Sequence, residues 1–259
     1  MIQRRLWILA AATSLMCQEK PARLTFEVSS IKPSKPSGRG GGIKPLPGGQ
    51  EYKAESVPVK LMISLMYKIP MRQITGGPGW LDTDLFDVDA KADKSYNLDD
   101  LHTMFQNLLA DEFKLKFHKE IKEGPVYLLT QDKAGSKMKI SESDRFSDIP
   151  IQGGPGGVVV GKRVPMQYFS WWFGNGVLQR DERPVIDKTG LDKFYDFTLS
   201  FLPELPPGMD FPKENLPPGF LDRPSIFDAL RQQLGLKLEA QKGPVEYYVI
   251  DHVEKPAEN

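Results

Sequence analysis

The sequence has almost no cysteine, little histidine and no excess charge of either sign. One cysteine and three histidines occur in 259 residues, so we expect neither a disulfide framework nor a structural zinc site, and we expect the histidines at the surface. Lysine plus arginine total 34, as do aspartate plus glutamate. This balance argues against nucleic acid or an anionic membrane as the main partner, because both attract basic proteins. No motif predicts a cofactor.

Long hydrophobic runs are absent except for one short run at the N-terminus. Two arginines precede the apolar stretch at residues 6–12, which is too short to span a bilayer. This pattern, a positively charged start followed by a short apolar run and a polar end, predicts a signal peptide over residues 1–17. We therefore expect a secreted or periplasmic protein with no membrane span after the signal peptide is removed. Cys17 has a weaker interpretation as a lipid-anchored residue, because Met16 stands where a small residue is expected.

What the sequence does contain is an internal repeat. Three short motifs occur twice, in the same order and at similar separations, which indicates two tandem copies of one structural unit. The matching motifs are Val57-Pro58-Val59 with Val164-Pro165-Met166, Gly79-Trp80-Leu81-Asp82 with Thr189-Gly190-Leu191-Asp192, and Gly124-Pro125-Val126 with Gly243-Pro244-Val245.

The hydrophobic pattern predicts the order β-α-β-β-α-β-β for each unit. Pro58 can open the first helix, residues 85–92 alternate as a half-buried strand, and Asn97 can cap a helix with one apolar stripe. Separate strands at 113–117 and 126–131 close the first unit. The sequence therefore predicts an α+β fold of two tandem units, with helices packed on small mixed or antiparallel sheets.

Turn-forming segments separate these units and interrupt the second one. Residues 203–224 contain seven prolines and are expected to form an extended surface insertion. We predict a signal peptide at 1–17, an N-terminal strand and Gly/Pro-rich loop at 18–50, a first unit at 51–133, a linker at 134–157, and a second unit at 158–259 that carries the insertion at 203–224.

Aromatic side chains near the first helix of each unit are the candidates for a binding surface. Trp171 and Trp172 are adjacent, so they cannot both face one way on a helix, and one of them is expected to line a groove or the interface between the units. The candidate ligand- or partner-binding residues are Trp80, Tyr168, Trp171 and Trp172.

Carboxylates are the other candidates. Asp82, Asp84 and Asp87 form a weak calcium candidate, but the spacing lacks the glycine of an EF-hand loop, so we predict no metal. A hydrolase or carbohydrate-active enzyme would need paired carboxylates across the units, either Asp87 with Asp187 or Asp87 with Glu182. That hypothesis requires the two groups to meet in one pocket.

Longer motifs across most of the chain carry a family resemblance. These motifs are Phe26–Pro33, Gly76–Asp82, Leu108–Lys116, Pro184–Leu191, Gln233–Glu239 and Val249–Pro256. They are similar to a family of secreted, soil-associated bacterial proteins expanded in Acidobacteria, with a domain of unknown function. Some members are fused to membrane metallopeptidases that resemble beta-lactam sensors, which implies a sensing or envelope role but no catalytic residues, cofactor or substrate.

The predicted element order is also similar to the N-terminal modules of secretins and TonB-dependent receptors, which bind protein partners by strand addition. Duplication without a polar catalytic constellation favours a non-catalytic binding or sensing module, with a protein or envelope component as its ligand. The alternatives are the hydrolase described above and a structural extracellular protein.

Overall fold

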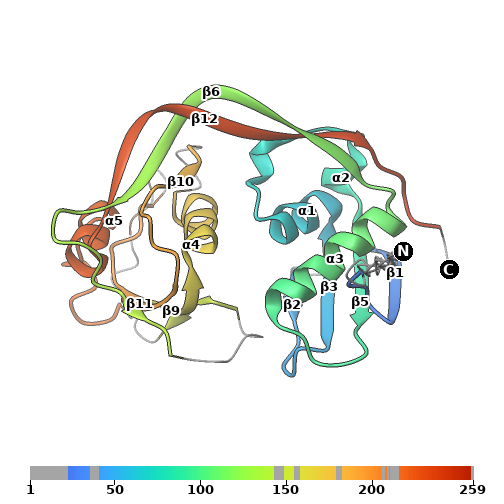
Figure 1. Ribbon diagram of the computed structural model, residues 1–259, viewed down its shortest axis with the longest axis horizontal. Coiled ribbons are helices and arrows are strands. Elements are labelled where there is room, and N and C mark those ends of the chain that lie inside the picture. The colour runs from blue at the N-terminus through green and yellow to red at the C-terminus, as the bar shows by residue number, and fades with distance from the viewer. Residues whose placement is uncertain are drawn as a thin grey trace, which may run out of the picture.

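A computed structural model of the chain describes residues 23–35, 41–142, 149–154, 158–178, 183–205, 208, 210 and 216–257. The expected signal peptide, with Cys17, lies outside these residues. The described part is mixed α+β, as predicted, and contains three four-stranded sheets. Figure 1 shows two lobes joined by a long ribbon of two strands, β6 (Lys116–Gln131) and β12 (Leu236–His252).

The first lobe combines an antiparallel sheet with helices. Its elements are β1 (Val28–Ser34), β2 (Gly42–Pro45), β3 (Glu51–Pro58), α1 (Val59–Tyr67), η1 (Met71–Gln73), α2 (Trp80–Thr83), β5 (Leu85–Lys91) and α3 (Leu98–Glu112). The strand order is β1-β5-β3-β2. The strand predicted within residues 18–50 is therefore part of this sheet, where β1 pairs with β5. Asn97 caps α3 by accepting the backbone N–H of Asp100 at 2.8 Å, as the sequence predicts.

The second lobe also combines an antiparallel sheet with helices. Its elements are β7 (Lys139–Ile140), β8 (Ile151–Gly154), β9 (Val158–Pro165), α4 (Met166–Trp172), the π-helical turn η3 (Phe173–Val177), β11 (Phe194–Leu199), α5 (Ile226–Ala229) and the π-helical turn η4 (Leu230–Leu234). The antiparallel strand order is β7-β11-β9-β8. Two of these strands, β7 and β8, come from the segment predicted as a linker.

The ribbon crosses from one lobe to the other. Strands β6 and β12 pair in antiparallel register, with Gly124 opposite Gly243 near the middle. Strand β4 (Ile74–Gly76) of the first lobe pairs parallel with the last part of β12, and β10 (Val185–Asp187) of the second lobe pairs parallel with the last part of β6. Each long strand therefore leaves one lobe and ends in the other.

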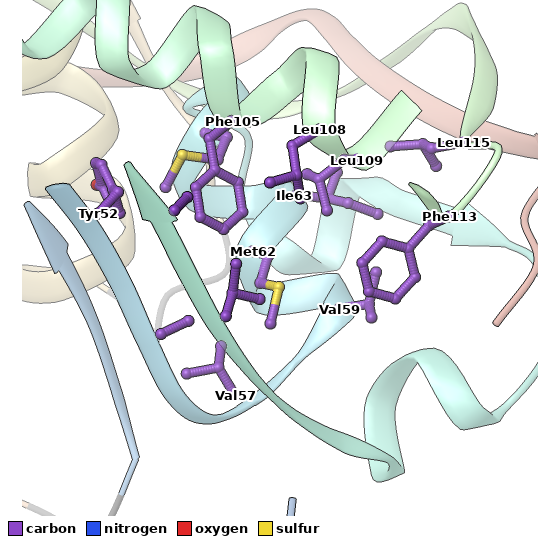
Figure 2. Close-up of a cluster of buried hydrophobic side chains, with 14 of the residues drawn as sticks. Tyr52, Val57, Val59, Met62, Ile63, Phe105, Leu108, Leu109, Phe113 and Leu115 are labelled. Carbon is purple, nitrogen blue, oxygen red and sulfur yellow. The ribbon is translucent and has the colours of Figure 1, made fainter. Parts of the chain in front are cut away.

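Most of the described buried apolar side chains form two clusters, one in each lobe. In the first lobe, α1 and α3 pack between the antiparallel sheet and the ribbon. Phe105 of α3 contacts Tyr52 of β3 with ring centroids 5.3 Å apart, and Tyr67 of α1 contacts Phe117 of β6 at 5.0 Å. Figure 2 shows the apolar side chains of α1 and α3 in this cluster, including Phe105.

The prediction of separate strands on either side of Gly124-Pro125 and of Gly243-Pro244 is wrong. Both segments are continuous strands. Strands β4 and β10 pair only near the two ends of the ribbon, so among the described strands its middle has two, with open edges. Proline lacks a backbone N–H. Where that position faces an open edge of the ribbon, no hydrogen bond between strands is lost, so the strand continues through the proline.

The same backbone irregularity occurs in both lobes. Ser56 in β3 and Arg163 in β9 each have a φ of 51°, in the left-handed region, and each lies in a β-bulge just before the proline that precedes a helix. The backbone N–H of Ser56 donates to Asp87 Oδ1 at 2.7 Å, and that of Arg163 donates to Asp196 Oδ1 at 2.8 Å. A carboxylate on the neighbouring strand thus stabilises each bulge.

Candidate functional site

Two adjoining pockets lie between the lobes, with volumes of about 510 and 490 Å³. The α3-side pocket is lined by the start of α3 and by β8, β9 and α4. The ribbon-side pocket is lined by η1, α4, β10 and residues of the ribbon. Lys68 lines both pockets, so we treat them together as one inter-lobe cleft. Volumes of this size accommodate small organic ligands.

Lys68 is placed in the cleft by the end of α1. It is the C-terminal cap of this helix, with a left-handed backbone, and its N–H donates to Ser64 O. Its side chain is 17% exposed, and its Nζ lies 3.0 Å from Asp99 Oδ1. Asp99 is 68% exposed, so the ion pair joins a solvent-facing carboxylate to a lysine whose side chain is mostly buried.

His102, in the first turns of α3, is buried in the wall of the α3-side pocket. Its Nε2 lies 3.1 Å from the hydroxyl oxygen of Tyr52, while its Nδ1 has no hydrogen-bond partner in the described part of the chain. Burial, with a smaller effect of Lys68, lowers the pKa of His102 to about 4, so the ring is neutral near pH 7. The expectation of a surface histidine is wrong at this position.

Helix α4 contributes Tyr168, Ser170 and Trp171 to the cleft. Tyr168 lines the α3-side pocket, Ser170 and Trp171 line the ribbon-side pocket, and the rings of Tyr168 and Trp171 lie 5.5 Å apart. Burial raises the pKa of Tyr168 to about 12, so its hydroxyl stays protonated. Ser170 Oγ and Trp171 Nε1 are buried and have no hydrogen-bond partner among the described residues.

The other aromatic candidates lie outside the cleft. Trp172 lines a separate pocket of about 350 Å³ in the second lobe and packs against Phe169 and Phe173. Trp80 packs edge-to-face on Phe86 in the first lobe and lines none of the three pockets. The structure therefore brings together Tyr168 and Trp171 from the candidate set and leaves Trp80 and Trp172 elsewhere.

The structure does not gather Asp82, Asp84 and Asp87, the weak calcium candidate, into one cluster. Asp82 pairs with Lys60 at 3.1 Å, Asp84 pairs with Lys255 at 2.6 Å, and Asp87 accepts the N–H of the β3 bulge. Within the residues that the structure describes, no group of three or more His, Cys, Asp or Glu side chains could hold a metal ion. The three carboxylates have separate structural partners.

The paired-carboxylate hypothesis requires Asp87 to share a pocket with Asp187 or Glu182. Asp187 lines the ribbon-side pocket, where its Oδ1 accepts the backbone N–H and the hydroxyl of Thr189. Asp87 lines none of the three pockets. Glu182 lies outside the described residues. The structure does not bring Asp87 and Asp187 together.

Lys68, His102 and Ser170 were missed by the sequence interpretation. A signal for His102 was present, because it falls four residues after Leu98 and three before Phe105, on the apolar stripe of its helix. No local pattern marks Lys68 or Ser170, because the cleft depends on the approach of two lobes.

The fold and the cleft define a two-lobed α+β protein with a partly polar site between the lobes. The family model described as "protein of unknown function (DUF3738)" matches residues 60–253, so the chain belongs to this family. The expectation of an uncharacterised family is thereby confirmed. No curated protein and no solved structure matches the chain. In the described part, no helix is long and apolar enough to cross a membrane.

Proposed function

We propose that the protein is a non-catalytic binding or sensing module, exported by its N-terminal signal peptide, that holds a ligand in the inter-lobe cleft. The observation that carries this proposal is a set of buried polar atoms without partners. His102 Nδ1, Ser170 Oγ and Trp171 Nε1 lack partners among the described residues, and all three side chains line the cleft.

Such atoms are costly unless something binds them. A buried donor or acceptor without a partner destabilises a protein by about 1–3 kcal/mol. Native proteins therefore pair nearly all of their buried polar groups, and exceptions mark functional positions or bound molecules. Three exceptions along one cleft support a ligand that supplies the missing partners.

The lobe arrangement supports a sensing role. A ligand between the lobes contacts both of them, and it can therefore favour one relative orientation of the lobes. In the part of the chain that the structure describes, the ribbon has two strands at its middle, where Gly124 faces Gly243. We propose that this segment is the hinge of such a motion.

We further propose that the chain is a strand-exchanged tandem duplication. The matched bulges at Ser56 and Arg163 support two copies of one unit. In a self-contained β-α-β-β-α-β-β unit, the last two strands would form a hairpin. In this protein the last part of β6 lies in the second lobe beside β10, and the last part of β12 lies in the first lobe beside β4. Each lobe therefore contains a strand end that the other copy would contribute to its own hairpin.

A pair of glycine variants tests the proposed site. Gly153 lines the α3-side pocket, whereas Gly42 does not. Both glycines lie in edge strands, and a Cβ added at either position would meet no atom within 4 Å. Gly153→Trp should fill the cleft, and Gly42→Trp should leave it open. Circular dichroism and the unliganded Tm check that both variants fold.

The assay is a thermal-shift screen against a library of small organic acids, sugars and short peptides. We expect at least one compound to raise the Tm of the wild type and of Gly42→Trp but not of Gly153→Trp. The proposal fails if no compound stabilises the wild type, or if every stabilising compound acts equally on Gly153→Trp.

A further inference from the structure

The geometry points to a ligand that carries a protonated amino group beside Asp187 and a carbonyl group beside Ser170 and Trp171, bound in the ribbon-side pocket. This inference rests on the proposed function, since it names the class of ligand for the same cleft. It follows from the hydrogen-bond donors of α4, from the charge of the pocket lining and from the apolar surface between these groups.

The α4 wall of the ribbon-side pocket offers hydrogen-bond donors. The indole Nε1–H of Trp171 can only donate, and it is buried without a partner in the described part of the chain. Ser170 is 5% exposed, and its buried hydroxyl also lacks a partner among these residues. A carbonyl oxygen has two lone pairs, so it could accept from the indole and from the hydroxyl together. A neutral carbonyl group therefore matches this wall.

The charged side chains that line the ribbon-side pocket within the described residues are Lys68, Asp187 and Glu246. The Nζ of Lys68 lies 3.0 Å from Asp99 Oδ1, so its charge is already paired. Glu246 Oε2 lies 3.3 Å from Lys119 Nζ and is paired as well. No cation of the described part pairs with Asp187. The charge left in the pocket is therefore negative, and an ammonium group on the ligand complements it.

Asp187 is held in position by hydrogen bonds to the turn that follows β10. Its Oδ1 accepts the backbone N–H of Thr189 at 2.9 Å and the hydroxyl of the same residue at 2.7 Å. Both of these bonds use Oδ1, so Oδ2 remains available to an ammonium donor. Strand β10 is also in contact with α4, so the carboxylate and the donors of α4 belong to neighbouring walls of one pocket.

Apolar side chains complete the lining. Ile69 and Pro184 line the ribbon-side pocket, as does Ile121 of β6, which is 68% exposed. The volume of about 490 Å³ and this lining fit an apolar or aromatic body that joins the two polar groups. A small inorganic cation would leave both the apolar surface and the donors of α4 without a partner. The ligand class is therefore an amino compound with a carbonyl group and an apolar body.

Three related compounds test this ligand class. Phenylalaninamide has the amino group, the carbonyl and an aromatic body, whereas 3-phenylpropanamide lacks the amino group and phenethylamine lacks the carbonyl. Binding to the full mature chain is measured by NMR titration near pH 6, where an α-amino group is protonated. We expect phenylalaninamide to bind about tenfold more tightly than 3-phenylpropanamide and about fivefold more tightly than phenethylamine. Equal affinity for phenylalaninamide and 3-phenylpropanamide would overturn the inference.

A fourth probe distinguishes two sources of the same chemical groups. Phenylalanyl-alanyl-alaninamide begins with the same residue as phenylalaninamide but continues as a peptide. Tighter binding of the peptide would indicate that the ligand is a peptide N-terminus. Tighter binding of phenylalaninamide would indicate a free small amine.

Two aspartate variants locate the amino group. Asp187→Asn removes the charge but keeps an oxygen that can accept from Thr189. Asp87→Asn makes the same change at a carboxylate that lines none of the three pockets. Phenylalaninamide should bind Asp187→Asn as weakly as 3-phenylpropanamide binds the wild type, and it should bind Asp87→Asn as tightly as the wild type. Circular dichroism checks both folds, and wild-type affinity in Asp187→Asn would contradict the inference.

Two tryptophan variants locate the carbonyl group. Trp171→Phe removes the indole N–H and keeps an aromatic ring, and Trp80→Phe makes the same change outside the three pockets. The preference for phenylalaninamide over phenethylamine should fall in Trp171→Phe and persist in Trp80→Phe. A preference in Trp171→Phe equal to that of the wild type would show that the carbonyl binds elsewhere, and the inference would then be wrong.

The remaining outcomes separate the class of ligand from the site. If no probe binds at millimolar concentration, but a library compound raises the Tm of the wild type and not that of Gly153→Trp, the cleft is a binding site and only the amine inference is wrong. If neither the probes nor the library compounds bind, both proposals are wrong.

Discussion

Replacing Ser170 by alanine should stabilise the unliganded protein. Ser170 is 5% exposed on α4, and its hydroxyl has no hydrogen-bond partner among the described residues. Removing such a group recovers the free energy of its desolvation, about 1–3 kcal/mol. Because about 1 kcal/mol changes the Tm of a chain of this size by about 2–4 °C, we expect a rise of roughly 2–12 °C.

Ser64→Ala is the matched control. Ser64 is also a buried serine on the first helix of its lobe, with 3% exposure, but its hydroxyl donates to Ile69 O. Its loss leaves a carbonyl without that donor and should lower the free energy of unfolding by about 1–3 kcal/mol. Thermal and urea unfolding measure both variants. Destabilisation by Ser170→Ala comparable to that of Ser64→Ala would refute the reasoning, and with it the main support for a ligand site.

Three further predictions concern His102, the two bulge carboxylates and Gly161. Burial lowers the pKa of His102 from 6.5 to about 4, so the unfolded chain binds a proton that the folded protein excludes between these pH values. Stability should therefore fall by about 3 kcal/mol as the pH drops from 6.5 to 4, and Tm measurements should show that His102→Gln lacks this loss. Asp87→Ala and Asp196→Ala each leave a bulge N–H unpaired, so each should cost about 1–3 kcal/mol in urea unfolding, and an unchanged midpoint would contradict this. Gly161→Ala places a Cβ against the ring of Phe197 and should lower the Tm through a cost of about 1–3 kcal/mol.

Local structure could be predicted well because its causes are local. Asn97 was predicted as a helix cap, and it accepts the backbone N–H of Asp100, three positions on. Ser225 caps α5 in the same way by accepting the backbone N–H of Asp228. Gly235 ends η4 with a left-handed φ of 68°, the conformation in which glycine is favoured at the end of a helix. The alternation in residues 85–92 was sufficient for β5, whose bounds are Leu85–Lys91.

The candidate site could be predicted only in part. Tyr168 and Trp171 were chosen for being aromatic, and the structure places both in the cleft. Trp80 has the same chemistry but packs on Phe86, because α2 places it against the first core. Residue type alone does not distinguish an aromatic side chain that lines a cleft from one that fills a core.

Local patterns were sufficient to predict the α+β class, the cap at Asn97, the strand alternation and the recurrence of motifs, since each depends on neighbours a few residues apart. The continuity of β6 and β12 became visible only in the folded protein, since their course depends on pairing across more than one hundred residues, as for Phe117 with Ile250. The same long-range pairing places Lys68 and His102 opposite Tyr168. A site assembled from two lobes has no local pattern in the chain, because the contacts that create it form only when the lobes meet.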